Sequence, residues 1–477
     1  MASLRHTRPA RAAGVLAICL GALLHGTAAR ANGAFPESQS LMTPESRPHD
    51  IRLATNFGIV MSDDDGQTWL WSCEQPQTNN GALYQMGPAP QLRLFAVSSE
   101  GLAFSDTDSC GWSVARGTVA GTNVIDAFPD PTNAKRVLAV AATTNDAGIT
   151  YAVLESSDGG ATFGPTRYAA AAGDNITGVE IARSAPSTIY ITMTSGATLA
   201  PKLAHSIDGG ATWQVDDLSS KLAAKTNLLR LVAVDPQNAE RVYLRVRSPA
   251  GEGFAVAVAS PNGFAVTTPL TFPDGILTAY TRLASGTMIV AAVVGVDDVA
   301  YRSGDAGASF QPLPRPPRVR ALSARGTTLY VVADNIIDGY AVGTSADEGQ
   351  SWQPLMRYEQ IAAIQACVKD ACQVDCQTRA DVGQWSADLC TATAPAPDAG
   401  SDAAADAAAT DAGGSSDAQR DSSGGADGNP DAAGPPPPKG GCGCDIVSPV
   451  APLALPATLA LLATAAALRR RRRRTRR

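Results

Sequence analysis

The fold of this chain follows from one octapeptide, Ser206-Ile207-Asp208-Gly209-Gly210-Ala211-Thr212-Trp213. Its pattern is Ser-x-Asp-x-Gly-x-Ser/Thr-aromatic, and the same pattern recurs in residues 62–69, 156–163, 303–310 and 345–352. Two weaker copies are residues 105–112, which keep the Ser and the Trp in register, and residues 260–264, which are shortened. The seven copies start 42 to 54 residues apart, and self-similarity at such a period indicates a repeat architecture.

The octapeptide pattern predicts a tight turn between two strands. The Asp carboxylate can accept backbone N–H groups of the turn. The Gly supplies a positive φ, and the aromatic residue starts the next strand and packs against the neighbouring layer. The residues expected in these three roles are Asp64, Gly66 and Trp69; Asp158, Gly160 and Phe163; Asp208, Gly210 and Trp213; Asp305, Gly307 and Phe310; and Asp347, Gly349 and Trp352.

Short apolar segments flank the octapeptides in pairs. Residues 231–236 and 241–246 have the pattern of two strands joined by a turn, and residues 179–183 and 188–193 form an equivalent pair. One further strand precedes each octapeptide and one follows it, so each repeat has four short strands. Seven four-stranded units predict an all-β fold, a seven-bladed β-propeller over residues 32–366, because radial stacking lets neighbouring sheets bury each other.

The closure of the ring can also be predicted. The first unit begins at Ile51 with what the pattern indicates are strands two to four only. After the last octapeptide, residues 360–365 have the pattern of a first strand with no repeat behind it. We expect this segment to pair into the first blade and lock the ring.

The octapeptide resembles the Asp-box, or BNR, repeat of sialidases, sortilin-type receptors, xyloglucanases and the photosystem II assembly propeller. The resemblance implies a propeller whose box carboxylates lie away from the active face, so we assign them no catalytic role. A sialidase would also need an early Arg-Ile-Pro-type motif, and the nearest candidate, Arg52-Leu53-Ala54, lacks the proline. No spacing singles out Tyr243 or Glu240, and we expect the basic residues within 315–320 to form a solvated loop. A xyloglucanase would place paired carboxylates across two propellers, and this chain has room for one.

Few other residues of the sequence are candidates for catalysis or metal binding. His205 precedes an octapeptide on an expected strand, where a packed or exposed structural role is favoured. The run Asp63-Asp64-Asp65 could suggest Ca²⁺, but its overlap with the turn favours a structural role. The sequence therefore predicts no catalytic residue, no metal and no cofactor.

Six cysteines fall in the expected folded body: Cys73, Cys110, Cys367, Cys372, Cys376 and Cys390. An even count in an exported protein favours three disulfides. We expect one bridge between Cys73 and Cys110, linking the first two blades, and two bridges of undetermined pairing within a disulfide-rich segment, residues 367–390. Zinc binding by the last four is the alternative, although their spacing fits a zinc site poorly.

The N-terminus has the features of a secretory signal. Three arginines precede an apolar run over residues 12–24, and Ala29-Arg30-Ala31 is a small-residue cleavage site that would release the chain after Ala31. The alternative is an uncleaved N-terminal anchor.

The C-terminus predicts a tethered protein. Residues 391–440 contain eight Asp and no Leu, Ile, Val, Met or aromatic residue, so we expect a disordered linker. Residues 446–468 form an uncharged apolar run long enough to span a bilayer, and an arginine-rich end follows it. Together with Cys442 and Cys444 just before the run, residues 441–477 resemble the C-terminal sorting signal of myxobacterial exported proteins. The resemblance implies removal of the helix by a sorting protease and surface display through a modified Cys442 or Cys444; a plain single-span anchor with the body facing the periplasm is the alternative.

The net charge of the expected folded body, residues 32–390, limits the classes of partner that it can bind. Residues 32–390 contain 24 basic and 36 acidic side chains, a net charge of −12, so a nucleic acid is excluded and an anionic polymer is a poor ligand. These observations favour an exported, outer-membrane or cell-surface propeller that binds a protein or a neutral glycan without catalysis. The alternative is an extracellular glycoside hydrolase, sialidase-like or xyloglucanase-like.

Overall fold

The structure, a computed structural model, describes residues 38–74, 83–146, 148–222 and 226–394. These residues belong to one compact unit, Glu37–Arg477. The expected signal peptide, nearly all of the expected linker, and the C-terminal region with Cys442 and Cys444 lie outside the described residues. Among the residues that are described, no helix combines the length and the apolar character needed to cross a membrane.

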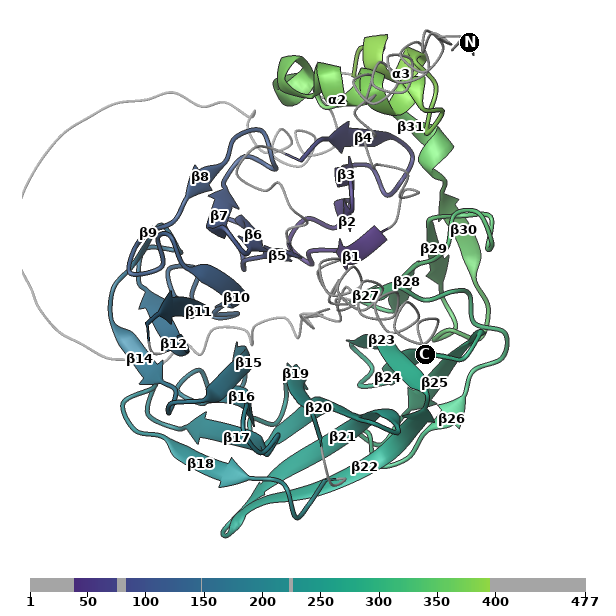
Figure 1. The fold of residues 1–477 in the computed structure, drawn as a ribbon. Helices are drawn as coiled ribbons and strands as arrows, with labels where there is room; N and C mark the ends of the chain where they lie inside the picture. Colours follow the sequence, from purple (N-terminus) through teal and green to yellow (C-terminus); the bar gives the residue numbers. More distant parts are fainter. Residues whose placement is uncertain (1–37, 75–82, 147, 223–225, 395–477) are drawn as a thin grey trace, which may run out of the picture. The chain divides into compact units, whose positions relative to one another are not determined.

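Seven antiparallel blades follow one another around a ring in the described part of the chain (Figure 1). Six blades have four strands, and the first has a fifth strand at its outer edge. The prediction of an all-β propeller with seven four-stranded blades is therefore confirmed.

The strands of blades 1 to 3 are given from the innermost to the outermost. Blade 1 contains β1 (Ser38–Met42), β2 (Ile51–Thr55), β3 (Gly58–Ser62) and β4 (Trp69–Ser72). Blade 2 contains β5 (Leu83–Met86), β6 (Leu94–Ser98), β7 (Gly101–Ser105) and β8 (Ser113–Val114). Blade 3 contains β10 (Asn123–Pro129), β11 (Val137–Asn145), β12 (Gly148–Ser156) and β14 (Thr166–Ala169), and a small parallel pair joins it to blade 2, β9 (Arg116–Gly117) with β13 (Thr162–Phe163).

The remaining four blades repeat this order. Blade 4 contains β15 (Asp174–Ile181), β16 (Ile189–Ser195), β17 (Pro201–Ser206) and β18 (Gln214–Asp217). Blade 5 contains β19 (Leu228–Val234), β20 (Arg241–Ser248), β21 (Gly251–Ser260) and β22 (Gly263–Pro273). Blade 6 contains β23 (Gly275–Arg282), β24 (Met288–Val294), β25 (Asp297–Ser303) and β26 (Gln311–Pro312), and blade 7 contains β27 (Ala321–Arg325), β28 (Thr328–Val332), β29 (Val342–Ser345) and β30 (Gln353–Met356).

Burial falls from the inner to the outer strands of a blade. The second strand of blade 4, β16, is an Ile/Tyr/Met/Thr-rich run whose first six residues are all buried, whereas most of the outermost strand β18 is exposed. A continuous apolar run is expected where both faces of a strand are covered by neighbouring sheets. The near-continuous apolar segments of the sequence therefore mark the inner strands.

The hydrophobic core is divided among the interfaces between blades. Seven clusters of buried side chains are found in the described residues, one at each junction of neighbouring blades around the ring. At the junction of blades 5 and 6, the rings of Tyr243, Phe254 and Tyr280 lie with centroids 5.6 to 5.8 Å apart. No blade has a core of its own, so the stability of each sheet depends on both neighbours.

The closing strand joins blade 1, but not in the predicted position. The segment β31 (Ile361–Ile364) pairs in parallel with β4 as a fifth, outermost strand (Figure 1). The innermost position belongs to β1, a strand that the sequence analysis missed, which pairs antiparallel with β2. The expectation that the first blade lacks its own first strand is therefore wrong, because the chain before Ile51 supplies one.

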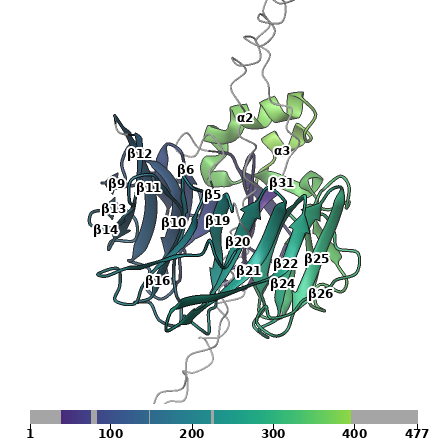
Figure 2. The same ribbon diagram turned by 60° about the horizontal axis from the view of Figure 1, so that its bottom comes forward.

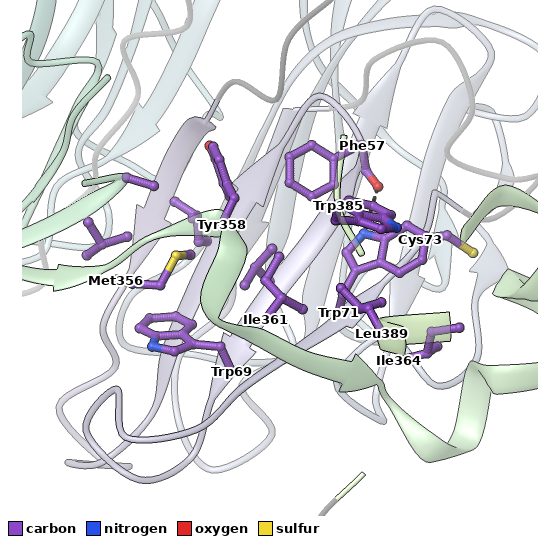
Figure 3. Packing of buried hydrophobic residues seen from close by; sticks show 14 of the residues in the cluster. Phe57, Trp69, Trp71, Cys73, Met356, Tyr358, Ile361, Ile364, Trp385 and Leu389 are labelled. Carbon is purple, nitrogen blue, oxygen red and sulfur yellow. Dashed lines mark hydrogen bonds between the residues drawn. The ribbon is translucent and has the colours of Figure 1, made fainter. Parts of the chain in front are cut away.

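A short helical segment follows β31, although the predicted fold class gave this region no helices. Its elements are η2 (Ala366–Val368), α2 (Lys369–Asp381) and α3 (Asp388–Thr391), and a separate 3-10 turn, η1 (Tyr358–Gln360), lies directly before β31. Figure 2 shows α2 and α3 together at one edge of the ring, near β31. In Figure 3, Trp385 of this segment lies against Phe57 and Trp71 of blade 1, with ring centroids 5.6 and 4.9 Å away.

Three disulfides fix the helical segment, and their pairing differs from the prediction. The bridges are Cys73–Cys372, Cys110–Cys367 and Cys376–Cys390. The expected Cys73–Cys110 bridge is wrong, and only one bridge lies within residues 367–390. The physical reason is that β31 brings the end of the ring onto blade 1, so each early cysteine meets a late one instead of its neighbour in sequence. Three disulfides are typical of proteins that fold in an oxidising compartment.

Candidate functional site

Each complete octapeptide forms the turn between the third and the fourth strand of its blade and is closed by the same three hydrogen bonds. The Ser hydroxyl donates to the Asp Oδ1 at 2.7–2.8 Å and accepts the Gly N–H at 2.8–2.9 Å. The same Asp Oδ1 accepts the N–H of the Ser or Thr four residues later at 2.8–2.9 Å. The turn therefore uses the carboxylate as an internal acceptor.

These bonds keep the octapeptide carboxylates ionised. The hydroxyl of Ser309 donates to Asp305 and that of Ser351 donates to Asp347, and with the backbone bonds they lower the pKa of both carboxyls to about 2. In blade 4 the hydroxyl of Thr212 holds the pKa of Asp208 far below its usual range in the same way. A carboxylate engaged on both oxygens is a poor general acid or nucleophile.

The octapeptide glycines lie where one blade meets the preceding one. All five have φ between +85° and +90°, a left-handed conformation that favours glycine. A Cβ on Gly160 of blade 3 would lie 2.7 Å from the Phe95 ring of blade 2, and one on Gly66 of blade 1 would lie 2.9 Å from Leu355 of blade 7. Each octapeptide therefore shapes the junction between blades as well as its own turn.

The octapeptide aromatics differ in their surroundings. Phe163 is buried, and Phe310 packs against the cluster between blades 5 and 6. The indole N–H of Trp69 donates to the carbonyl of Gly66 at 2.9 Å, and that of Trp213 donates to the carbonyl of Arg167 at 2.8 Å and of Gly210 at 3.2 Å. The indole nitrogen of Trp352 is buried and has no hydrogen-bond partner in the structure.

The two weak copies keep the turn with fewer bonds. In blade 2, Ser105 accepts the N–H of Ser109 at 3.1 Å, while Thr107 stands in the Asp position with its hydroxyl 3.5 Å from Ser105. In blade 5, β21 and β22 join directly, and Ser260 donates to the Gly263 carbonyl at 2.9 Å. A carboxylate is therefore not required at every turn of the ring.

Arg52, the nearest candidate for the early arginine of a sialidase-like motif, already forms ion pairs inside the protein. The Arg52 side chain is 2% exposed, and its guanidinium pairs with Asp50 at 3.0 Å and with Asp63 at 2.7 Å. Asp65 pairs instead with Arg325 of blade 7 at 2.9 Å, and Asp64 closes its own turn. The three consecutive aspartates thus have separate partners and do not converge on one cation position.

The other residues weighed in the sequence do not form a catalytic pair. The buried Tyr243 hydroxyl donates to Asp235 at 2.9 Å, whereas Glu240 is exposed. Arg318 pairs with Asp298 at 3.5 Å and Asp334 at 3.8 Å, so this member of the basic segment forms internal ion pairs.

His205 is packed among aromatic side chains. Its ring lies 5.2 Å from that of Phe264 and 6.1 Å from that of Tyr190. Burial lowers the pKa of this imidazole, and the nearest carboxylate, Asp216, lies 3.8 Å from Nδ1. Within the described ranges, no group of three or more His, Cys, Asp or Glu side chains is arranged to hold a metal ion.

The structure reveals a different set of acidic residues, which the sequence analysis did not single out. Asp126 on β10 accepts the N–H of Val179 in blade 4 at 3.0 Å, and Glu180 on β15 accepts the N–H of Val234 in blade 5 at 2.7 Å. The signal that could have found them is an acid flanked on both sides by apolar residues within an inner strand, as in Ile125-Asp126-Ala127 and Val179-Glu180-Ile181. Each carboxyl reaches from one blade to the innermost strand of the next.

Glu252 in blade 5 extends the same arrangement to blade 6. Its carboxylate accepts the N–H of Leu277 at 2.7 Å and is held by a two-pronged ion pair with Arg245, at 2.7 and 2.8 Å. Both partners are almost completely buried, so the pair is satisfied within the protein. Carboxyl groups thus connect blades 3 to 6 in series.

Glu180 has the most unusual protonation among these acids. Burial raises its pKa to about 8, and the nearby charge of Asp126 acts in the same direction. Burial also raises the pKa of Asp126, against the positive charge of Arg230. A perturbed acid pair is a common mark of a functional site, although structural networks produce it as well.

The space around Glu180 decides what the pair can do. A cavity of about 30 Å³ is lined by Glu180, Arg183, Tyr280, Arg282 and neighbouring apolar residues. A volume of this size accommodates about one water molecule. The cavity therefore has room for a water molecule beside Glu180, but a sugar ring does not fit there.

The comparisons with known proteins find no relative by sequence and only distant similarity to solved structures. No protein-family model and no curated protein sequence matches this chain. Among solved structures, it is similar to the GH74 xyloglucanase from Xanthomonas campestris (12% identity, TM-score 0.37), with 68% of this chain and 58% of the enzyme aligned. It is also similar to YCF48 from Cyanidioschyzon merolae (11% identity, TM-score 0.42), with 63% of this chain and 93% of that chain aligned. A third similar structure is prolyl oligopeptidase B from Galerina marginata (10% identity, TM-score 0.46), with 68% of this chain and 51% of that chain aligned. The chain thus spans less than two thirds of the first xyloglucanase it matches.

Proposed function

We propose that this protein is an exported, surface-anchored Asp-box propeller that binds a protein or glycan partner and performs no catalysis. The observation that carries the proposal is the internal use of the candidate reactive groups. The five octapeptide aspartates close their turns, the Arg52 guanidinium pairs with Asp50 and Asp63, and Tyr243 donates to a buried aspartate. Arg52 and Tyr243, which were weighed for a sialidase-like centre, are therefore already paired inside the ring.

Two further observations support this proposal. The Ser–Asp–Gly hydrogen-bond pattern, repeated in five turns, is what the resemblance to the Asp-box family implies for a structural motif. The three disulfides agree with export. Attachment would depend on the C-terminal region, and replacing both Cys442 and Cys444 by Ala should release the protein from the cell surface into the medium. Unchanged surface labelling of that double variant would contradict thiol-based anchoring.

A glycoside hydrolase is the second candidate, and one observation favours it. Glu180 stays protonated near neutral pH beside Asp126, which is the protonation that a general acid needs. The cavity of about 30 Å³ beside it argues against substrate access.

Reducing-end assays separate the two candidates. The purified full chain, incubated with neutral and sialylated glycans, should release no reducing ends above a buffer control. Turnover that is lost in both Glu180→Gln and Asp126→Asn, but retained in a variant of an exposed acid such as Glu240→Gln, would establish the hydrolase and overturn the binding proposal.

A further inference from the structure

The innermost strands of blades 3 to 6 carry a row of equivalent side chains beside the middle of the ring (Figure 1). Each of β10, β15, β19 and β23 has one bulged residue, and two residues before the bulge stand Asn123, Asn175, Arg230 and Ile276. All four are exposed or partly exposed. They lie near the start of their strands, at the end of each blade opposite to the octapeptide turn, because the first and third strands run in the same direction. We refer to these four residues as the inner row.

The cation of the inner row has no partner. Arg245, which stands opposite Arg230 in the ladder, forms a two-pronged ion pair with Glu252 at 2.7 and 2.8 Å. The guanidinium of Arg230 itself forms no hydrogen bond and no ion pair in the described part of the chain. Unlike the unpaired nitrogens of Arg52 and Arg183 that are buried, those of Arg230 keep accessible surface. A ligand can therefore reach this guanidinium.

The surroundings of Arg230 leave its charge poorly compensated. Burial lowers the pKa of Arg230 and the charge of Arg245 acts in the same direction, while Asp126 of blade 3 opposes them from outside ion-pair distance. The two blades approach each other over Gly178 of blade 4, where an added Cβ would lie 3.3 Å from Asp126 Oδ2 and 3.8 Å from Cβ of Leu231, the residue after Arg230. A charge that is partly removed from water without a partner costs free energy, and an anionic group of a ligand would recover it.

The other members of the inner row suit a peptide. The side-chain amides of Asn123 and Asn175 form no hydrogen bond in the described part of the chain, and an amide both donates and accepts, as a peptide backbone requires. Ile276, in the blade next to Arg230, is 47% exposed and offers an apolar contact. A guanidinium binds a carboxylate through two parallel N–H bonds. Two amides, one cation and one aliphatic side chain thus match a peptide with a single acidic residue.

We propose that the inner row binds a peptide segment of a protein partner, with one carboxylate of that segment held by Arg230. This inference rests on the proposed binding function and names its site and its ligand. The net charge of −12 over residues 32–390 repels a polyanion such as a repeating acidic glycan. A single carboxylate in an otherwise uncharged segment avoids that repulsion and meets an unpaired cation.

The experiment measures binding of the blocked peptide acetyl-Leu-Ala-Glu-Ala-Leu-amide to the purified full chain by saturation-transfer NMR and calorimetry. The same peptide with Gln in place of Glu is the uncharged probe, and glucuronate and inorganic phosphate are tested as other anions. Arg230→Gln removes the cation, Arg230→Lys keeps the charge without the two-pronged geometry, and Asn175→Ala changes the row without touching Arg230. The matched control is Arg116→Gln, the same change at an exposed arginine whose side chain forms no ion pair in the described part of the chain.

We expect the Glu peptide to bind, and Arg230→Gln to weaken that binding about ten- to hundredfold, the range that hydrogen bonds between charged groups imply. Arg230→Lys should fall between Arg230→Gln and the unmodified protein, Asn175→Ala should weaken binding about threefold, and Arg116→Gln should leave it unchanged. Because Arg230 has no partner to lose, Arg230→Gln should melt no lower than the unmodified protein, a result that a structural role would not give.

No binding of the Glu peptide, equal binding of the Gln peptide, or binding that Arg230→Gln leaves unchanged would each refute this site and keep the proposed binding function. A fall in the melting temperature of Arg230→Gln, with Asn175→Ala binding as tightly as the unmodified protein, would make Arg230 structural and also refute it. Binding of glucuronate or phosphate through Arg230, without binding of the peptide, would show that the ligand class is wrong. Release of reducing ends from a glycan would instead overturn the proposed function.

Discussion

Alanine substitutions at glycine positions separate the energetic cost of a collision between neighbouring blades from the cost of straining a turn. Gly160 has φ +88°, and an added Cβ would lie 2.7 Å from Cε1 of Phe95 in the preceding blade. Gly121 has φ +71°, and an added Cβ there would meet no atom within 4 Å. Substitution by Ala therefore introduces backbone strain at both positions, but a collision between blades at Gly160 alone.

The expected losses in the free energy of unfolding follow from the backbone strain and from the collision between blades. A left-handed backbone costs a non-glycine residue about 1–2 kcal/mol, which is the whole effect expected for Gly121→Ala. Overpacking a buried site costs about 1–3 kcal/mol more, so Gly160→Ala should lose about 2–5 kcal/mol in the free energy of unfolding. Urea denaturation followed by tryptophan fluorescence measures both losses. Equal losses in the two variants would show that this glycine does not contact the next blade and would refute the reasoning.

Three further predictions concern the acids and the closure. Burial raises the pKa of Glu180 from 4.5 to about 8, so the folded protein holds a proton that the unfolded chain releases, and the resulting stability is lost as the pH rises from about 4.5 through about 8. Glu180→Gln should therefore flatten the dependence of the urea midpoint on pH between 5 and 8; an unchanged slope would mean that this carboxyl is not the buried acid. In the chain-entropy picture, the Cys73–Cys372 bridge, with a sequence separation of 299, contributes about 5–6 kcal/mol, and Cys376–Cys390, with a separation of 14, about 3 kcal/mol. Paired Cys→Ser variants compared by thermal melting should follow that order, and the reverse order would contradict the closure. A chain that ends at Tyr358 lacks β31 and the helical segment and should lose its cooperative melting transition, whereas an unchanged melting curve would refute the closing role.

The number of blades could be predicted because each blade carries its own marker. The Ser, Asp and Gly of the octapeptide make local bonds, all within a few residues in sequence, so the pattern specifies its turn without help from the rest of the chain. Even the shortened copy at Ser260 occupies the position between the third and fourth strands. Local chemistry repeated at a regular interval is the information that a single sequence conveys best.

The closure could be predicted only in part because it depends on distant contacts. β31 has an apolar pattern that indicates a strand, but nothing local determines whether it pairs at the inner or the outer edge of blade 1. The short strand β1 lies before the first recognisable repeat and has no octapeptide near it. The cysteine pairing follows from where β31 lies, so an error in its position became an error in connectivity.

The buried acids between blades were missed for a related reason. Asp126 and Glu180 each accept a hydrogen bond from a backbone N–H group of the next blade, so their role depends on contacts with that blade. In the sequence each is an acid between two apolar neighbours, a pattern that also fits an exposed strand. The unpaired indole of Trp352 is likewise visible only in three dimensions, since its octapeptide is identical in pattern to those with paired indoles.

Peptide mapping of the intact, non-reduced protein tests most directly whether seven blades are closed into a ring through the C-terminal segment. The account predicts three linked fragments, joining Cys73 to Cys372, Cys110 to Cys367 and Cys376 to Cys390. A fragment that joins Cys73 to Cys110 would contradict it, because the end of the chain would then not be fastened to the first two blades.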